Sequence, residues 1–363
     1  GQFRHNLFES DGPNRDRNDF EIERLRLVFN GHAFSPDFEY FFQLDADNDV
    51  GVGGDVVDML DYYVTYDFGH DIFGCDAKRL RFRLGKWKIG FNRAREESGT
   101  RMQFSDRSVA SVLFDFDRSV GFGFLGEVGR FDWQATVANG IDTGGFRPGR
   151  VGQLDRNMAV ATRVNYLLSG DWGKDGHADL DWRETPAIRL GSGFTYTRRD
   201  IEGIREFNFP RVVDSGAPIN TVLPPGVTAY NHLMYAADVN VKYRGWSFIC
   251  EYYWRQFTGF SGAIVPNLFD HGYWIELGYF VIPEHLQLVA RQSRTLGDSG
   301  TVGAIEESAD EVAGGFVLYF RRHNLKLTCD ATRVNGVPVG DSALGFIPGD
   351  DGWLFRTTFQ WKF

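Results

Sequence analysis

The chain has 363 residues, of which 15% are aromatic, and it carries a formal net charge of −10 at neutral pH. That acidity argues against a general nucleic-acid-binding protein. No stretch approaches the roughly 18 consecutive apolar residues that a transmembrane helix needs. Cys75, Cys250 and Cys329 are too few and too widely spaced to predict a disulfide framework or a metal site.

About sixteen segments show the alternation of apolar and polar residues that is typical of β-strands. In chain order they span residues 2–8, 21–33, 38–45, 56–68, 80–89, 120–128, 131–140, 158–168, 187–197, 232–243, 246–257, 273–282, 286–296, 311–321, 325–335 and 353–363. Loops rich in Gly, Pro and Asp separate them. The alternation slips near Lys86–Ile89, where we expect a β-bulge.

The last segment shows the alternation most clearly. One face carries Trp353, Phe355, Phe359, Trp361 and Phe363, and the other carries Leu354, Arg356, Thr358, Gln360 and Lys362. A strand of a soluble β-protein can alternate in this way, but it seldom has five aromatic residues on one face. The pattern suits a strand with lipid on one side and water on the other. It predicts an all-β, antiparallel transmembrane barrel that forms a single domain over residues 1–363 and contacts outer-membrane lipid.

The connections between the predicted strands alternate between short and long. Bacterial barrels have short periplasmic turns and longer external loops, so we place Phe363 at the periplasmic end. Two connections on that side, residues 69–79 and 169–186, are longer than this rule predicts. We also expect Arg at Phe316, on the lipid face, to cost about 2–4 kcal/mol, and Arg at Val317 to cost much less.

The inward-facing phase of the strands is rich in charge. Its bases are Arg24, Arg26, Arg81, Arg83, Arg163, Arg189, Lys242, Arg255, Arg291, Arg321, Lys326, Arg356 and Lys362, and its acids are Glu39, Asp45, Asp61, Asp132, Asp238, Glu251, Glu276 and Asp330. A charged wall selects ions by sign. The excess of bases leans toward anions, although any single residue could simply be paired and keep the wall hydrated.

Residues 90–119 are dense in arginine and acidic residues. They contain Asp106-Arg107-Ser108 and end on Arg118-Ser119, which Val120-Gly121 follow, and the strand before them carries Lys86 and Lys88. These motifs, together with the Arg24–Gly31 stretch, resemble the phosphate-selective porin O/P family over roughly residues 20–140 and at the C-terminus. Asp106 stands where the family has Glu.

The resemblance implies a sixteen-stranded barrel, usually a homotrimer, whose third external loop folds inward as a constriction. Here that loop would be residues 90–119. The constriction candidates are Arg93, Arg95, Arg101, Arg107, Arg118, Glu96 and Asp106, and the wall candidates are Arg24, Arg26, Arg81, Arg83, Lys86, Lys88 and Arg356. The family motifs carry over only to Arg107, Arg118, Lys86 and Lys88. The acids of the loop argue against tight phosphate binding.

The sequence therefore predicts an outer-membrane porin that passes small hydrophilic solutes, with a modest preference for anions. Such a porin requires no cofactor, no catalytic residue and no nucleic-acid partner. On this view, replacing Arg93 and Arg107 with Ala shifts selectivity toward cations. An outer-membrane enzyme built on a barrel, or a non-conducting scaffold or adhesin, remains the alternative.

A cluster of closely spaced acids, Asp45, Asp47 and Asp49, has the oxygen ligands that hard cations prefer. The EF-hand template fails, because Val50 and Val56 occupy its Gly and Glu positions. An acidic turn is the favoured interpretation, and a cation site is the alternative.

Overall fold

A computed structural model describes residues 1–46, 57–74, 78–146, 150–213, 216–297, 308–339 and 345–363. Strands dominate it, and they form one sheet. The strands are β1 (Gln2–Ser10), β2 (Arg17–Arg24), β3 (Arg26–Ala33), β4 (Ser35–Asp45), β5 (Asp58–Asp67), β6 (Arg81–Lys88), β7 (Arg118–Val128), β8 (Phe131–Ala138), β9 (Ala159–Ser169), β10 (Ala187–Asp200), β11 (Ala229–Tyr243), β12 (Trp246–Ser261), β13 (Leu268–Ile282), β14 (Leu286–Leu296), β15 (Ser308–Arg321), β16 (Leu325–Asn335) and β17 (Gly352–Trp361).

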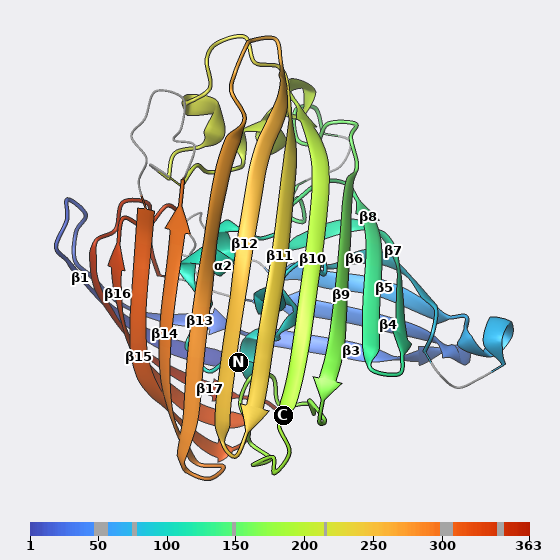
Figure 1. Cartoon of the computed structure of the whole chain (residues 1–363), viewed down its shortest axis with the longest axis vertical. Coiled ribbons are helices and arrows are strands. Elements are labelled where there is room, and N and C mark those ends of the chain that lie inside the picture. The colour runs from blue at the N-terminus through green and yellow to red at the C-terminus, as the bar shows by residue number, and fades with distance from the viewer. Residues whose placement is uncertain (47–56, 75–77, 147–149, 214–215, 298–307, 340–344) are drawn as a thin grey trace.

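Each strand pairs antiparallel with the strands that adjoin it in the chain, except that β2 and β3 continue one another, and β1 pairs with both β17 and β2. The sheet therefore curves round and returns to its start as a nearly closed barrel (Figure 1). Closure removes the exposed sheet edges that would otherwise leave backbone groups unpaired in lipid. The predicted all-β barrel is confirmed. Among the described residues no helix is long and apolar enough to cross a membrane.

The described residues form seventeen strands because the predicted strand 21–33 is divided at Leu25. Its first part, β2, pairs with β1, whereas its second part, β3, pairs with β4. The two parts run on in one direction past different neighbours, so together they fill one position in the barrel. The prediction of about sixteen strands thus differs from the structure by this one interruption.

The two faces of β17 are divided as the alternation predicts. Trp353, Phe355 and Phe359 are about 40% exposed on the outer face, whereas Leu354 and Arg356 are buried on the inner face. The same division is found along β12, where Trp254 is exposed and Arg255 is buried. The outer surface of the barrel is therefore aromatic and aliphatic, as lipid contact requires.

The expected bulge at Lys86–Ile89 is not found. β6 pairs with β7 in continuous register from Arg81 opposite Leu125 to Lys88 opposite Arg118. The local distortion lies instead at Gly85, whose φ is +136°. A Cβ atom there would lie 2.2 Å from the Tyr62 carbonyl oxygen, so this approach of β6 to β5 requires glycine.

The lipid-facing position Phe316 allows a direct test of the barrel register. Phe316→Arg should destabilise the folded barrel by about 2–4 kcal/mol, because a guanidinium would face hydrocarbon, whereas Phe316→Leu should cost much less. Urea titration of the protein folded into lipid vesicles measures both. Equal stability of the two variants would place Phe316 in the lumen.

The small cost expected for Arg at Val317 is wrong, because that position does not face open water. Val317 is fully buried and packs in a cluster with Phe104, Leu180 and Phe280 inside the barrel. A guanidinium there would be overpacked and desolvated, and each effect costs about 1–3 kcal/mol or more.

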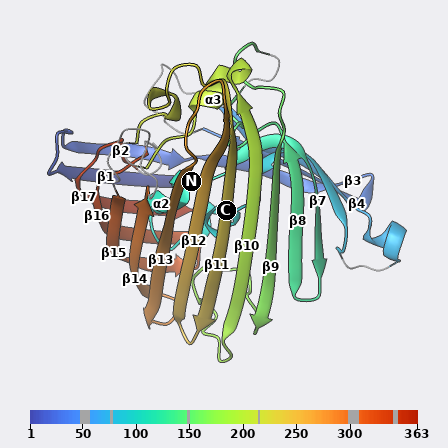
Figure 2. The same ribbon diagram turned by 45° about the horizontal axis from the view of Figure 1, so that its top comes forward.

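The two ends of the barrel differ. The end that carries both chain termini has tight turns such as Gly129-Arg130 and Arg244-Gly245, and the opposite end carries the long loops and the short helix α3 (Ile204–Asn208) (Figures 1 and 2). We call these the turn end and the loop end. Gly1 donates to the Trp361 carbonyl oxygen over 2.7 Å, which places the two termini side by side.

Candidate functional site

The segment between β6 and β7 lies inside the barrel, where α2 is seen against the inner surface of the sheet (Figures 1 and 2). It contains α1 (Arg93–Glu96), the 3-10 turn η2 (Gly99–Arg101) and α2 (Val109–Leu113). The helices begin where polar N-caps accept backbone hydrogen bonds: the Asn92 side chain accepts from Arg95 N, and the Ser108 side chain accepts from Ser111 N. We call residues 90–119 the inner loop.

Carboxylates on the opposite wall hold the inner loop by its backbone. Glu251 on β12 accepts from Arg93 N over 2.5 Å and from Ala94 N over 3.2 Å. Glu311 on β15 accepts from Val109 N over 2.7 Å, and Asp330 on β16 accepts from Ser105 N over 3.1 Å. Three of these contacts, those of Arg93 N, Ala94 N and Val109 N, satisfy N–H groups at helix N-termini, where a negative charge is also favoured by the helix dipole. The loop is thus fixed across the barrel.

Two predicted constriction residues stabilise the inner loop by contacts within it. Arg93 pairs with Glu96 and Glu97 and is buried. Arg107 is also buried and donates to the carbonyl oxygens of Ala94 and Glu97, each over 3.0 Å. Both arginines therefore hold the loop in shape.

Two acids of the inner loop bind arginines of the wall. Asp106 accepts from Arg4 over 3.0 Å and from Arg24 over 3.1 Å. Glu96 pairs with Arg163 over 2.9 Å. The acids that weaken the case for phosphate binding are thus neutralised by wall bases at these two positions.

Two further predicted constriction residues, Arg95 and Arg118, belong to an ionic cluster where the inner loop returns to β7. Arg95 pairs with Asp115 and, over 3.3 Å, with Asp117. Asp117 also lies 3.4 Å from Arg118, whose guanidinium binds Asp61 on β5 over 2.8 and 3.1 Å. These five residues, together with Lys88 at the end of β6, are called the gate cluster below. Among the described residues Lys88 has no ion pair.

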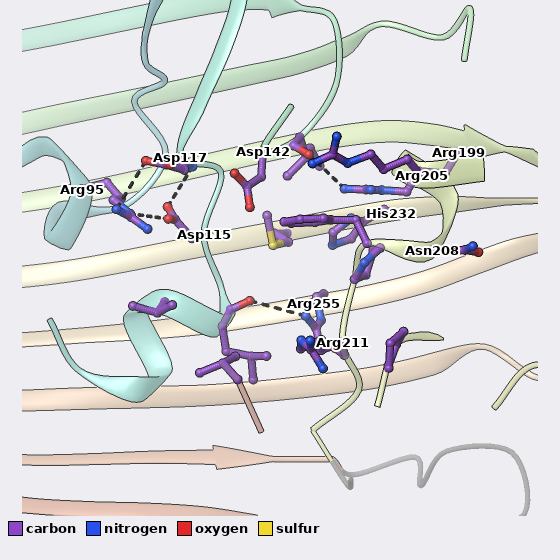
Figure 3. Close-up of a pocket in the computed structure, with 18 residues that line it drawn as sticks. Arg95, Asp115, Asp117, Asp142, Arg199, Arg205, Asn208, Arg211, His232 and Arg255 are labelled. Atoms are coloured by element: carbon purple, nitrogen blue, oxygen red, sulfur yellow. Dashed lines mark hydrogen bonds and ion pairs between the residues drawn. The ribbon is translucent and has the colours of Figure 1, made fainter. Parts of the chain in front are cut away.

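The gate cluster lies between two cavities of about 640 Å³ each. The cavity on the loop-end side, called the outer cavity, is lined in part by Arg95, Asp115 and Asp117 (Figure 3). The other, called the inner cavity, reaches the chain termini and is lined in part by Asp61, Lys88 and Arg118. Charged side chains of one cluster therefore border both water-accessible spaces.

The predicted wall residues are mostly paired. Arg26 binds Asp45, Arg81 binds Glu127 over 2.6 Å, and Arg356 binds Asp330 over 2.8 Å. Arg83 lies over the Tyr63 ring at 4.1 Å, and Lys86 donates to the Met59 carbonyl oxygen over 3.2 Å.

Arg101 of the inner loop lies apart from the gate cluster. A Cβ atom on Gly176 would lie 2.7 Å from Arg101 Cβ, so these two segments touch inside the barrel. Arg101 thus meets a second inward segment.

That second segment, residues 170–186 between β9 and β10, is one that the sequence did not assign to the site. It folds into the barrel from the turn end: Ala178 and Leu180 are fully buried and pack with Phe104 of the inner loop and Phe280 of the wall. Lys242 donates to the Trp172 carbonyl oxygen over 3.2 Å, with its ammonium 4.3 Å from the Trp172 ring. We call residues 170–186 the turn-end plug. The sequence does contain a signal for this segment: the connection at residues 169–186 is longer than expected at the end of the barrel that has short turns.

A substitution within the turn-end plug tests whether the plug narrows the passage, without altering any strand. Leu180→Asp should raise the single-channel conductance, because an unpaired carboxylate in that apolar cluster costs several kcal/mol and would push the plug outward. Planar-bilayer recording measures this. Lys174→Gln, on the exposed surface of the plug, removes one positive charge and should leave the conductance unchanged. Equal conductance of Leu180→Asp and the wild type would mean that the plug does not narrow the passage.

The candidate cation cluster is not assembled in the described part of the chain. Asp45 is bound to Arg26, while Asp47 and Asp49 lie outside the described residues. Over the described ranges no group of three or more His, Cys, Asp or Glu side chains is placed to hold a metal ion.

A comparison with protein-family models found a match in the first part of the chain. Residues 3–162 match the family model described as phosphate-selective porin O and P. No curated protein sequence matches the chain at a significant level.

Solved outer-membrane barrels share the fold. A trimeric form of OmpT from Vibrio cholerae has a TM-score of 0.59 at 11% identity over 99% of this chain and 98% of its own. An anion-selective porin from Comamonas acidovorans has a TM-score of 0.59 at 12% identity, over 99% and 97%. OprB from Pseudomonas putida has a TM-score of 0.58 at 10% identity, over 100% and 92%.

The lipid-facing aromatic surface, the inward-folded loop and the family match over residues 3–162 lead to one assignment. The chain forms a barrel of the outer-membrane porin type, and over residues 3–162 it is similar to the phosphate-selective porin O and P family.

Proposed function

We propose that this porin passes small hydrophilic solutes by diffusion, with a modest preference for anions, and that it catalyses no reaction. The observation that carries the proposal is the gate cluster between the outer and inner cavities. Its three bases and three acids are equal in number, but Arg95 and Arg118 pair with all three acids while Lys88 has no ion pair among the described residues. When Lys88 is protonated, its unpaired ammonium beside the passage would favour anions.

Tight phosphate binding is not part of the proposal. Arg93 and Arg107, which could have formed a phosphate-binding ladder, are engaged by Glu96, Glu97 and backbone carbonyl oxygens within the loop. Selectivity would then arise from the local field in a narrow passage, where Coulomb energies exceed their value in bulk water.

Diffusion of solutes can be tested by liposome swelling. Vesicles that contain the purified protein should swell in small sugars and in small organic anions, and the rate should fall steeply with solute size because the inner loop and the plug both occupy the lumen. Ester and peptide hydrolysis by the same preparation should not exceed background. Hydrolysis that is lost on unfolding would favour the barrel-enzyme alternative.

A closed scaffold is the second candidate, and the packing of two inward segments favours it. The inner loop and the turn-end plug meet at Phe104 and Leu180 and fill the part of the lumen enclosed by β13 to β15. Absence of any swelling or conductance from correctly folded protein would support this candidate over the porin proposal.

We also propose that three chains associate, as the trimeric Vibrio cholerae barrel does. Light scattering of the detergent-solubilised protein, corrected for bound detergent, should give three times the chain mass of 41.2 kDa. A protein mass of one chain in mild detergents would contradict the trimer.

A further inference from the structure

The outer cavity has features of a binding site as well as of a vestibule. Its volume of about 640 Å³ lies within the range that is usual for small-molecule sites. It is enclosed by the end of α2, by the connection between β8 and β9 and by the segment around α3, with His232 and Met234 of β11 on the wall (Figure 3).

Three arginines at this cavity lack a carboxylate partner in the described ranges: Arg199, Arg205 and Arg211. Arg199 is 1% exposed and donates to the carbonyl oxygens of Glu206 and Ile141, and its Nε has no acceptor. Arg205 donates to Gln153 over 2.9 Å. Arg211 donates to the Gly216 carbonyl oxygen over 2.6 Å. Because all of these acceptors are neutral, no ion pair in the described ranges offsets the positive charge of these three arginines.

The acids nearby do not cancel these charges. Asp115 and Asp117 are held by Arg95 on the other side of the cavity (Figure 3). Burial, reinforced by the two other aspartates, raises the pKa of Asp142 well above its usual value. Burial also raises the pKa of Glu206 to about 7. Even with Glu206 about half ionised at pH 7, the three arginines leave the side of the cavity near α3 positive.

The side chain of His232, on the wall of the outer cavity, is a further polar group available to a ligand. His232 is 3% exposed, and neither of its ring nitrogens has a hydrogen-bond partner in the described structure. Buried polar groups are usually paired, so a water molecule or a ligand in the cavity would supply the missing partner of His232. The rest of the wall is largely apolar, with Val112, Leu113, Phe209, Pro210 and Met234.

We propose that the outer cavity binds a small organic anion with an apolar body, such as an aromatic monocarboxylate, before it reaches the gate cluster. The carboxylate would lie among Arg199, Arg205 and Arg211, and the ring would cover Phe209 and Met234. Inorganic phosphate would satisfy the charges but leave the apolar wall hydrated. This inference rests on the proposed function for its biological meaning, since it names the solute class that the channel would favour.

Titration calorimetry on the full chain in detergent tests the ligand class. Benzoate should bind about tenfold or more tightly than acetate and inorganic phosphate, because only benzoate buries an apolar surface. Benzyl alcohol, which has the ring without the charge, should bind more weakly than benzoate. Benzoate that binds no more tightly than acetate and phosphate would overturn the proposal.

Substitutions locate the site. Arg211→Gln and Arg205→Gln should each weaken benzoate binding about tenfold, as expected for the loss of a charged hydrogen bond. Arg198→Gln is the matched control: Arg198 lies on the same strand as Arg199, but it bonds Ser261 and Asn231 on the opposite face. Should Arg198→Gln weaken binding as much as Arg211→Gln, the effect is general electrostatics and the site is not where we place it.

The binding assay does not depend on conduction, so the two proposals fail separately. Conductance with an anion preference but no selective benzoate binding would leave the porin proposal standing and remove this site. Selective benzoate binding by a barrel that does not conduct would establish the site and contradict the porin proposal.

Discussion

Glu251→Ala should release the inner loop, with a large rise in single-channel conductance and a loss of stability of about 3–5 kcal/mol. The Glu251 carboxylate accepts from Arg93 N, from Ala94 N, from the Tyr253 hydroxyl over 2.7 Å and from Trp274 Nε1 over 3.1 Å. Removing it leaves four buried donors without this acceptor, and the first helix of the loop loses its anchor on the wall. Planar-bilayer recording and urea titration in vesicles measure the two effects.

Two control substitutions separate the effect of losing the hydrogen-bond acceptor that holds the inner loop from the effect of losing a negative charge. Glu251→Gln retains one carbonyl acceptor and should give an intermediate conductance. Glu284→Ala removes the same charge from the exposed turn between β13 and β14 and should change neither property. If Glu251→Ala conducts like the wild type, the inner loop does not set the width of the passage.

The second large effect is on ion selectivity. Arg95→Gln should move the reversal potential toward cations, because Asp115 and Asp117 both lose the guanidinium that binds them. A unit charge about 7 Å from an ion, at an effective dielectric constant of about 40–80, changes the local ion concentration about three- to sevenfold. Arg130→Gln, in the exposed turn between β7 and β8, removes the same charge and should have no effect. A reversal potential unchanged by Arg95→Gln would exclude the gate cluster as the selectivity filter.

The structure changes how the substitutions of Arg93 and Arg107 are understood. A shift toward cations in those variants stays a prediction, but both side chains hold the inner loop in shape. Any change in selectivity there would be mixed with a change in pore width. Arg95 is the cleaner probe, because it faces the outer cavity directly.

The strands and their faces could be predicted because lipid on one side and a polar interior on the other impose a period of two. The division at Leu25 could not, since it depends on where β1 and β4 meet the strand. Alternation also says nothing about what fills the interior. The burial of Val317 follows from the turn-end plug, a contact between segments far apart in the chain.

The candidate site shows the same limit. Sequence composition identified residues 90–119 as unusual, and the family resemblance supplied the inward fold. Which arginine is buried and which faces water depends on partners such as Glu251 and Asp61, which lie on distant strands. The outer cavity is assembled from six separate parts of the chain, which are residues 95–117, 141–142, 199–218, 232–234, Arg255 and Val339, so no local sequence pattern predicts it.

The reversal potential of the wild-type channel, recorded across a planar bilayer in a tenfold KCl gradient, tests the central claim most directly. A narrow passage beside the unpaired Lys88 should give a modest preference for Cl⁻ over K⁺, and Lys88→Gln should reduce it. A clear preference of the wild type for K⁺ would contradict the account, because the gate would then be governed by Asp61, Asp115 and Asp117 rather than by the bases beside them.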